Sequence, residues 1–274
     1  MWDIAQFMAA PFVACLVLVG LHAYLGLHVL LRGVIFVDLA LAQIAALGTI
    51  TAIVAGHHPG TPIAYAFSLA ATVLGAAIFA LTRMRRGTVP QEAVIGITFV
   101  VASAATILLA DRAPEGGEQI KELMSGTILW VSWKNVLNAA LIYSALGFFH
   151  VLFRRRFMLI SEHPDRAYAS GIRVRLWDFL FYVSFGLMIT VSVHMAGVLM
   201  VFSYLVAPAI IALATSKSWS VRILIAWTVG VLASALGLVA SYQWDLPSGP
   251  AIVCVLGSLL ASFAFYQVLR PAQS

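Results

Sequence analysis

One acidic residue lies at the edge of a long apolar stretch of this chain. Asp38 precedes a run of 44 residues, from 39 to 82, that contains no Lys, Arg, Asp or Glu. A carboxylate among apolar residues is unfavourable unless it has a counter-ion, a proton or a polar cavity. Asp38 is therefore either a ligand or gate for a cation, or a carboxyl group neutralised by Arg32 or by protonation.

Gln43 is the next polar side chain after Asp38. Five residues rotate an α-helix by roughly 500°, which leaves these two side chains about 140° apart. The pair therefore cannot bind one ion from a single helix face unless the helix is kinked or bulged. Asp38 instead shares a face with Ala42, Ala45 and Thr49, whose small side chains favour close helix packing.

Three other polar residues lie in or beside apolar stretches. His194 precedes Met195 at an expected turn, where an imidazole either passes a divalent cation inward or serves as an interfacial polar residue. Pro208 removes the backbone N–H that would bond the carbonyl of Tyr204, so that carbonyl is either an ion ligand or part of a plain kink. His22 is expected to bond to a neighbouring helix.

The composition places these residues in a membrane. Of 274 residues, 62% are hydrophobic and 10% are charged, and the mean hydropathy is +0.99. Soluble domains carry roughly 25% charged residues, so an ordinary soluble protein is excluded. A helix needs about 20 residues to cross a bilayer, and the longest uncharged runs must therefore fold back once.

The uncharged runs predict an all-α, polytopic membrane protein with about nine transmembrane helices in a single transmembrane domain, residues 1–274. The break points are the polar and helix-breaking residues from His57 to Pro62 and from His194 to Gly197. The expected spans are 8–28, 34–56, 63–82, 93–110, 135–153, 177–194, 197–214, 222–241 and 250–269.

The basic residues predict the orientation. With the N-terminus outside and the C-terminus cytoplasmic, thirteen of the sixteen Lys and Arg residues fall in cytoplasmic segments, as the positive-inside rule requires. These residues are divided among separate loops, so nucleic-acid binding is not expected. The longest segment between spans, about 154–176, is too short for a soluble domain, and there is no P-loop GxxxxGK[ST]. ATP, if it drives this protein, must bind another chain.

Five segments in order resemble the permease subunits of the bacterial zinc, manganese and iron ABC importer family. They are VDLALAQIAALG (37–48), TVPQEAVIGI (88–97), LMSGTILWVSW (123–133), AGVLMVFSYLVAPAIIA (196–212) and DLPSGPAIVCVLG (245–257). When the AALG stretch is aligned, Gln43 falls on the metal-binding His of the family and Leu39 falls on its Asp. The resemblance therefore does not carry an imidazole site onto this span.

A sixth segment, EHPDRAYASGI (162–172), resembles the part of the family that packs against the ATPase. A Pro near its start and a Gly at its end are typical of a short helix on the membrane surface. The resemblance implies a role in ATPase coupling for Glu162, His163, Pro164, Asp165, Arg166, Ala167 and Gly171. The alternative is a solvated linker.

The resemblance implies an ATP-driven importer in the bacterial inner membrane that carries a divalent metal through a homodimer. A cytoplasmic ABC ATPase and an extracytoplasmic solute-binding protein are the implied partners, and the chain is expected to be embedded in the lipid bilayer. The chain is not expected to be an enzyme or to hold a permanent cofactor, and ATP acts only through the partner. The candidate path residues are Asp38, Gln43, His194 and Tyr204.

Two alternative functions stay open. The same architecture suits a metal chelate or another small solute recognised by polar contacts, because the family His is replaced by Gln43. A secondary transporter driven by protons through Asp38 is the other alternative. It is disfavoured because such folds often have inverted repeats and several charges inside the membrane, whereas this sequence has one buried acid and no clear repeat.

Overall fold

The described residues fold into helices that match the apolar runs of the sequence. The computed structural model describes residues 2–58, 60–83, 89–112, 117, 126 and 128–269. Within them, eight helices are long and apolar enough to cross a membrane by length and composition. A helix satisfies its backbone N–H and C=O groups with hydrogen bonds inside the segment, which is why apolar segments are helical in a bilayer.

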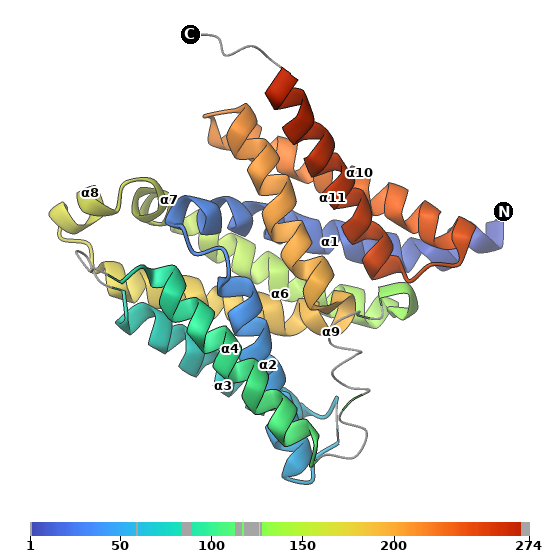
Figure 1. Ribbon diagram of the computed structural model, residues 1–274, viewed down its shortest axis with the longest axis horizontal. Coiled ribbons are helices and arrows are strands. Elements are labelled where there is room, and N and C mark those ends of the chain that lie inside the picture. Colours follow the sequence, from blue (N-terminus) through green and yellow to red (C-terminus); the bar gives the residue numbers. More distant parts are fainter. Residues whose placement is uncertain are drawn as a thin grey trace. The chain divides into compact units, whose positions relative to one another are not determined.

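The helices follow one another along the chain with short connections (Figure 1). The long ones are α1 (Trp2–Arg32), α2 (Val37–Val54), α3 (Pro62–Leu81), α4 (Gln91–Ala110), α6 (Trp133–Leu152), α9 (Val174–Thr215), α10 (Trp219–Trp244) and α11 (Ser248–Leu269). The short ones are the 3-10 turn η1 (Ile128–Trp130), α7 (Arg154–Glu162) and α8 (Pro164–Ala169).

Nine spans are expected and eight long helices are present, because α9 covers two of the expected spans. Expected spans 177–194 and 197–214 both lie in this 42-residue segment. A straight helix of that length would measure about 63 Å, roughly twice the apolar thickness of a bilayer. Gly197 has non-helical backbone angles, φ 76° and ψ 159°, which L-residues with a Cβ rarely adopt. The helix is therefore interrupted at Gly197, where the sequence predicts a turn.

The chain divides into two compact units. One comprises Met1–Leu27, Ser125–Ala140 and Met195–Ser274, and the other comprises His28–Met124 and Leu141–His194. We call them the terminal unit and the central unit. Asp38, Gln43, His194 and the segment 154–176 belong to the central unit, and Tyr204 belongs to the terminal unit.

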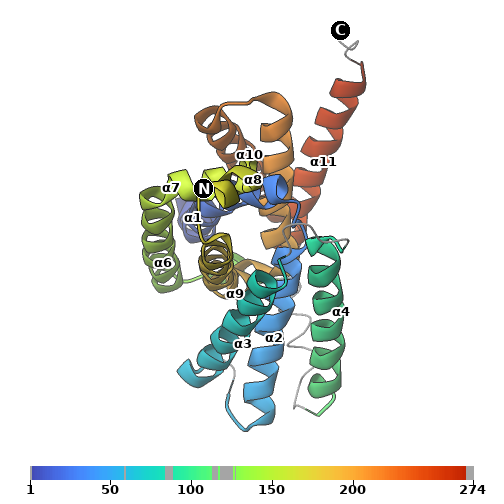
Figure 2. The ribbon, with the colours of Figure 1, turned by 90° about the vertical axis from the view of Figure 1, so that its left-hand side faces the viewer.

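In the central unit, α2 packs against both α3 and α4, and the three helices lie together in both views (Figures 1 and 2). The small-residue row of α2 is buried, and the Ser68 hydroxyl of α3 donates to the Ala45 carbonyl at 3.0 Å. A Cβ on Gly48 would collide with the backbone of Phe67 and Ser68. The predicted close packing of this helix face is therefore present.

In the terminal unit, α10 packs against α11 and also contacts α1 and α9. The indole N–H of Trp227 in α10 donates to the Gly20 carbonyl of α1 at 2.9 Å. Gly26 of α1 lies so close to Leu205 of α9 that a Cβ would collide with its carbonyl. Small residues thus allow close helix contacts here as well.

Candidate functional site

Asp38 is completely buried near the start of α2. Its relative exposure is 0%, and neither carboxylate oxygen has a hydrogen-bond partner within the described residues. The expected neutralisation by Arg32 does not occur in the described structure, because the Arg32 Nη1 atom lies 2.8 Å from Asp178 instead. A buried carboxyl group without a partner requires a proton or a cation.

The surroundings of Asp38 come from several helices of the central unit. Glu92, in the first turn of α4, accepts the backbone N–H of Phe36 at 2.9 Å and thereby ties α4 to the beginning of α2. The phenol of Tyr143 in α6 lies within electrostatic range of Asp38 and donates to the Met188 carbonyl of α9 at 3.3 Å. Asp38 therefore lies where α2 meets other helices of its unit.

Gln43 is also buried, with a relative exposure of 6%. Helix α2 is an unbroken α-helix from Val37 to Val54. Without a kink or bulge, Asp38 and Gln43 remain about 140° apart around the axis, so they do not form a two-ligand site on one face. Among the residues that the structure describes, no three His, Cys, Asp or Glu side chains form a possible metal site.

The two candidate histidines make bonds within their own helices. His194 is exposed, and its Nδ1 atom lies 2.8 Å from the Thr190 carbonyl, one turn earlier in α9. His22 is buried in α1, and its Nδ1 atom lies 2.7 Å from the Leu18 carbonyl. This bond lies within α1, and the bond of His22 to a neighbouring helix stays a prediction.

Tyr204 is buried in the terminal unit, where its hydroxyl lies 2.6 Å from the hydroxyl of Ser234 in α10. Ser234 in turn donates to the Gly230 carbonyl at 2.6 Å. Four residues after Tyr204, Pro208 lies inside α9. The hydroxyl of Tyr204 therefore has a packing role between two helices, while the Pro208 ring leaves the Tyr204 carbonyl without its usual donor.

The segment expected to couple to an ATPase forms two short helices. Pro164 is at the start of α8, Gly171 has φ 72° after its end, and the Ile172 N–H bonds back to the Ala167 carbonyl at 3.2 Å. Ala167 is fully buried and anchors the helix. The side chains of Glu162, His163, Asp165 and Arg166 are exposed. The predicted short surface helix is present, with polar side chains available to a partner.

A buried ionic cluster next to this segment was missed by sequence reasoning. Asp178 of α9 is fully buried and accepts from Arg32 at 2.8 Å and from Arg83 at 2.7 Å. The Arg32 Nε atom also donates to Ser161 of α7 at 2.8 Å, and its guanidinium carbon lies 3.9 Å from the centroid of the Phe181 ring. The available signal was an acid at the edge of span 177–194, at the same membrane level as two arginines.

Comparisons with known proteins agree with this architecture. The model of the ABC 3 transport family matches residues 4–267. The chain is 23% identical over 266 residues to the "Probable iron transport system membrane protein" of Haemophilus influenzae, covering 97% of this chain and 95% of that protein. It is 27% identical over 197 residues to the "Manganese transport system membrane protein MntB" of Synechocystis, covering 72% of this chain and 62% of that protein.

The fold is also that of a solved structure. The match to "PsaBC from Streptococcus pneumoniae in complex with Fab" has a TM-score of 0.80 at 22% identity, and it covers 99% of this chain and 95% of that one. Together with eight candidate membrane spans, the family match over almost the whole sequence identifies a multi-pass membrane protein. The chain belongs to the ABC 3 transport family, whose members are permease subunits that work with a separate ATPase subunit.

Proposed function

We propose that this chain is the permease subunit of an ATP-driven importer for a divalent metal ion. The observation that carries this proposal is Asp38, a fully buried carboxyl group whose oxygens have no hydrogen-bond partner within the described residues. Carboxylate oxygens are suitable ligands for divalent cations such as manganese. A cation that passes Asp38 would supply a positive charge that no described residue places on this carboxylate.

A single Asp38 is too small a ligand set for a divalent metal, which usually takes four or more ligands. We infer that the permease is a homodimer and that the cargo passes between the two copies, so that each contributes its Asp38. The two compact units of each chain then form one permease domain over residues 1–274. His194 is proposed to meet the cargo at the outer mouth, and the Tyr204 carbonyl is proposed to lie farther along the path.

The proposed coupling segment connects this path to the partner ATPase. In the proposed orientation, with the N-terminus outside and the C-terminus cytoplasmic, α7 and α8 lie on the cytoplasmic side. The exposed side chains Glu162, His163, Asp165 and Arg166 would contact the ATPase together with Pro164, Ala167 and Gly171. ATP-driven movement of the ATPase would displace α7 and α8 and open the path alternately to either side. An extracytoplasmic solute-binding protein would deliver the cargo.

Import of a metal chelate, or of another small solute, is the second candidate. Gln43 favours it, because a buried neutral amide suits hydrogen bonds to an organic ligand better than it suits a bare ion. The orientation of Gln43 away from the face of Asp38 also fits a cargo larger than one ion. Both candidates use the same architecture.

Elemental analysis of the native host under metal limitation tests the proposal. Wild type is compared with a deletion strain and with that strain carrying the wild-type gene, Asp38→Ala or Asp111→Ala. Asp111 is exposed at the end of α4 and serves as a matched acidic control.

We expect one metal to fall in the deletion and to be restored by Asp111→Ala but not by Asp38→Ala at equal expression. No change of any metal in the deletion would contradict divalent-metal import and leave the other solutes. Full restoration by Asp38→Ala would remove Asp38 from the path.

A further inference from the structure

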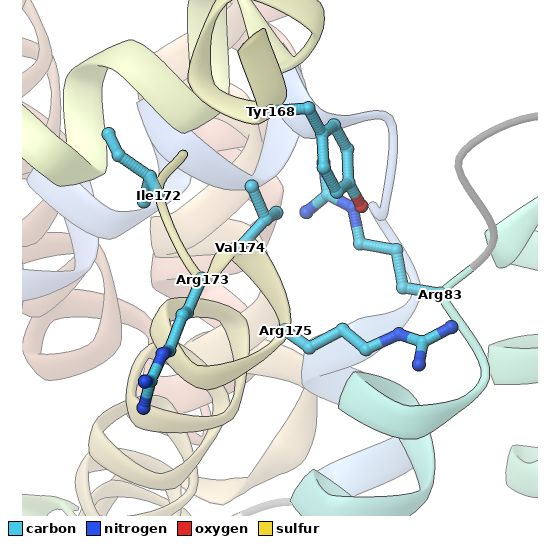
Figure 3. Close-up of a pocket in the computed structure, with 6 residues that line it drawn as sticks. All are labelled: Arg83, Tyr168, Ile172, Arg173, Val174 and Arg175. Atoms are coloured by element: carbon cyan, nitrogen blue, oxygen red, sulfur yellow. The ribbon is translucent and has the colours of Figure 1, made fainter. Parts of the chain in front are cut away.

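A basic pocket lies at the junction of α8 and α9 in the central unit. Its volume is about 340 Å³, and it is lined by Arg83, Tyr168, Ile172, Arg173, Val174 and Arg175. Arg83 follows the end of α3, Tyr168 belongs to α8, and Arg175 belongs to the first turn of α9 (Figure 3). Arg83 is thus distant in sequence from the other lining residues, which all come from the short stretch 168–175.

The pocket is positively charged: three of its described lining residues are arginines, and none of the described lining residues is acidic. Arg83 is held by one nitrogen, Nη1, which donates to Asp178 at 2.7 Å. Arg173 and Arg175 are exposed, and within the described part of the chain neither guanidinium group has a hydrogen bond or an ion pair. Asp178 is already shared with Arg32. The side chains around the pocket therefore leave a positive charge that an anion can neutralise.

The donors indicate the type of anion. Guanidinium groups bind phosphate oxygens through two parallel N–H bonds, and they do so better than ammonium groups. The pocket also lies at the first turn of α9, whose backbone dipole favours a negative charge nearby. A phosphate group fits both the charge and the volume.

The position of the pocket indicates the source of the phosphate. Arg83 is two residues beyond the end of α3, and Val174 is the first residue of α9, so the pocket lies where membrane helices begin and end. Next to these residues, Leu81 is 70% exposed and Leu176 is 47% exposed. Exposed leucines beside arginines suit a lipid, whose acyl chains contact the leucines while its headgroup contacts the guanidinium groups.

We propose that this arginine pocket binds the phosphate of an anionic phospholipid such as phosphatidylglycerol or cardiolipin. The inference is independent of the cargo and requires only the membrane setting of the chain. Because Tyr168 belongs to α8, a bound headgroup would also hold the junction between the proposed coupling segment and α9.

The test uses the full chain purified from its native membrane in a mild detergent. The variant Arg173→Gln/Arg175→Gln removes two pocket arginines, and Arg173→Lys/Arg175→Lys keeps their charge. The matched control, Arg154→Gln/Arg155→Gln, removes two exposed arginines of α7 outside the pocket. Retained phospholipid is measured by mass spectrometry, and thermal stability is measured with added phosphatidylglycerol, phosphatidylcholine or inorganic phosphate.

We expect the glutamine variant to retain less anionic lipid than wild type by about tenfold, since two charged hydrogen-bond donors are lost. The α7 control should retain the wild-type amount, and the lysine variant an intermediate one. Phosphatidylglycerol should raise the melting temperature of wild type and of the control only, and phosphatidylcholine should raise neither.

Three results would overturn the inference. Equal lipid retention by all variants would show that the pocket does not select anionic lipid. Stabilisation by inorganic phosphate equal to that by phosphatidylglycerol would indicate a soluble anion. If the glutamine variant kept its lipid but no longer co-purified with the ATPase, the arginines would serve a protein partner instead.

Discussion

The guanidinium of Arg32, at the end of α1, lies 2.8 Å from the carboxylate of Asp178, in the second turn of α9, although the two residues are 146 positions apart in the sequence. Both side chains are almost fully buried, with exposures of 1% and 0%. Arg83 is the third member of this cluster, and it pairs with the other carboxylate oxygen of Asp178. The cluster joins the end of α1, and Arg83 two residues beyond the end of α3, to α9, directly beside the proposed coupling segment.

We expect Asp178→Asn to destabilise the protein by about 3–5 kcal/mol, because it removes the charge that two arginines share and leaves Arg32 buried without it. The apparent melting temperature in a fixed detergent measures the effect. Asp165→Asn is the control, since Asp165 is exposed in α8. Equal melting temperatures for Asp178→Asn and wild type would show that the cluster does not stabilise the fold.

The limits of the membrane helices could be predicted from hydropathy because charged residues flank the apolar runs. Helix α3 runs from residue 62 to 81 and α4 from 91 to 110, within two residues of the expected spans. Helix α1 begins at Trp2, whereas its expected span begins at 8, because hydropathy detects the apolar part of a helix and not its polar extension. The interruption of α9 was predicted at the correct place, because Gly197 has non-helical backbone angles and divides the segment into two helices.

The site was only partly predictable. The burial of Asp38 follows from a single sequence run and is present in the structure. The partner of Arg32 depends instead on which residues meet in space: the sequence predicts Asp38, six positions later, whereas the structure has Asp178, 146 positions away. Only the packing of α7 and α9 against the end of α1 decides between them, and no local pattern encodes that packing.

Gln43→Ala separates the two ligand candidates of α2. Because Gln43 and Asp38 lie about 140° apart on an unbroken helix, we expect the two substitutions to differ in strength. Loss of one neutral hydrogen bond to the cargo should lower the uptake rate about fivefold, whereas Asp38→Ala should abolish uptake. The initial rate of metal uptake into the complemented deletion strain measures both. Equal loss in both variants would mean that the two side chains bind one ion, which requires α2 to bend.

Gly26→Ala tests the close contact of α1 with α9. A Cβ at this position would collide with the Leu205 carbonyl, and overpacking of this kind costs about 1–3 kcal/mol. Gly20→Ala is a matched control in the same helix, because no atom lies within 4 Å of its added Cβ. We expect a lower melting temperature for Gly26→Ala only. A similar decrease in both variants would indicate a general intolerance of α1 to alanine.

Pro208→Ala distinguishes the path role of the Tyr204 carbonyl from a packing role. An alanine at 208 supplies the N–H that the carbonyl lacks, so the carbonyl becomes bonded within α9 and unavailable to a cation. We expect the protein to be at least as stable as wild type, since proline disfavours a helix interior, while its uptake rate falls several-fold. Tyr204→Phe is the companion variant: it removes the hydroxyl and its bonds to Ser234 and Cys15, costs about 1 kcal/mol of stability, and should leave uptake near the wild-type rate. If Pro208→Ala takes up metal normally, the carbonyl lies outside the path, and Tyr204 serves only to pack α9 against α10.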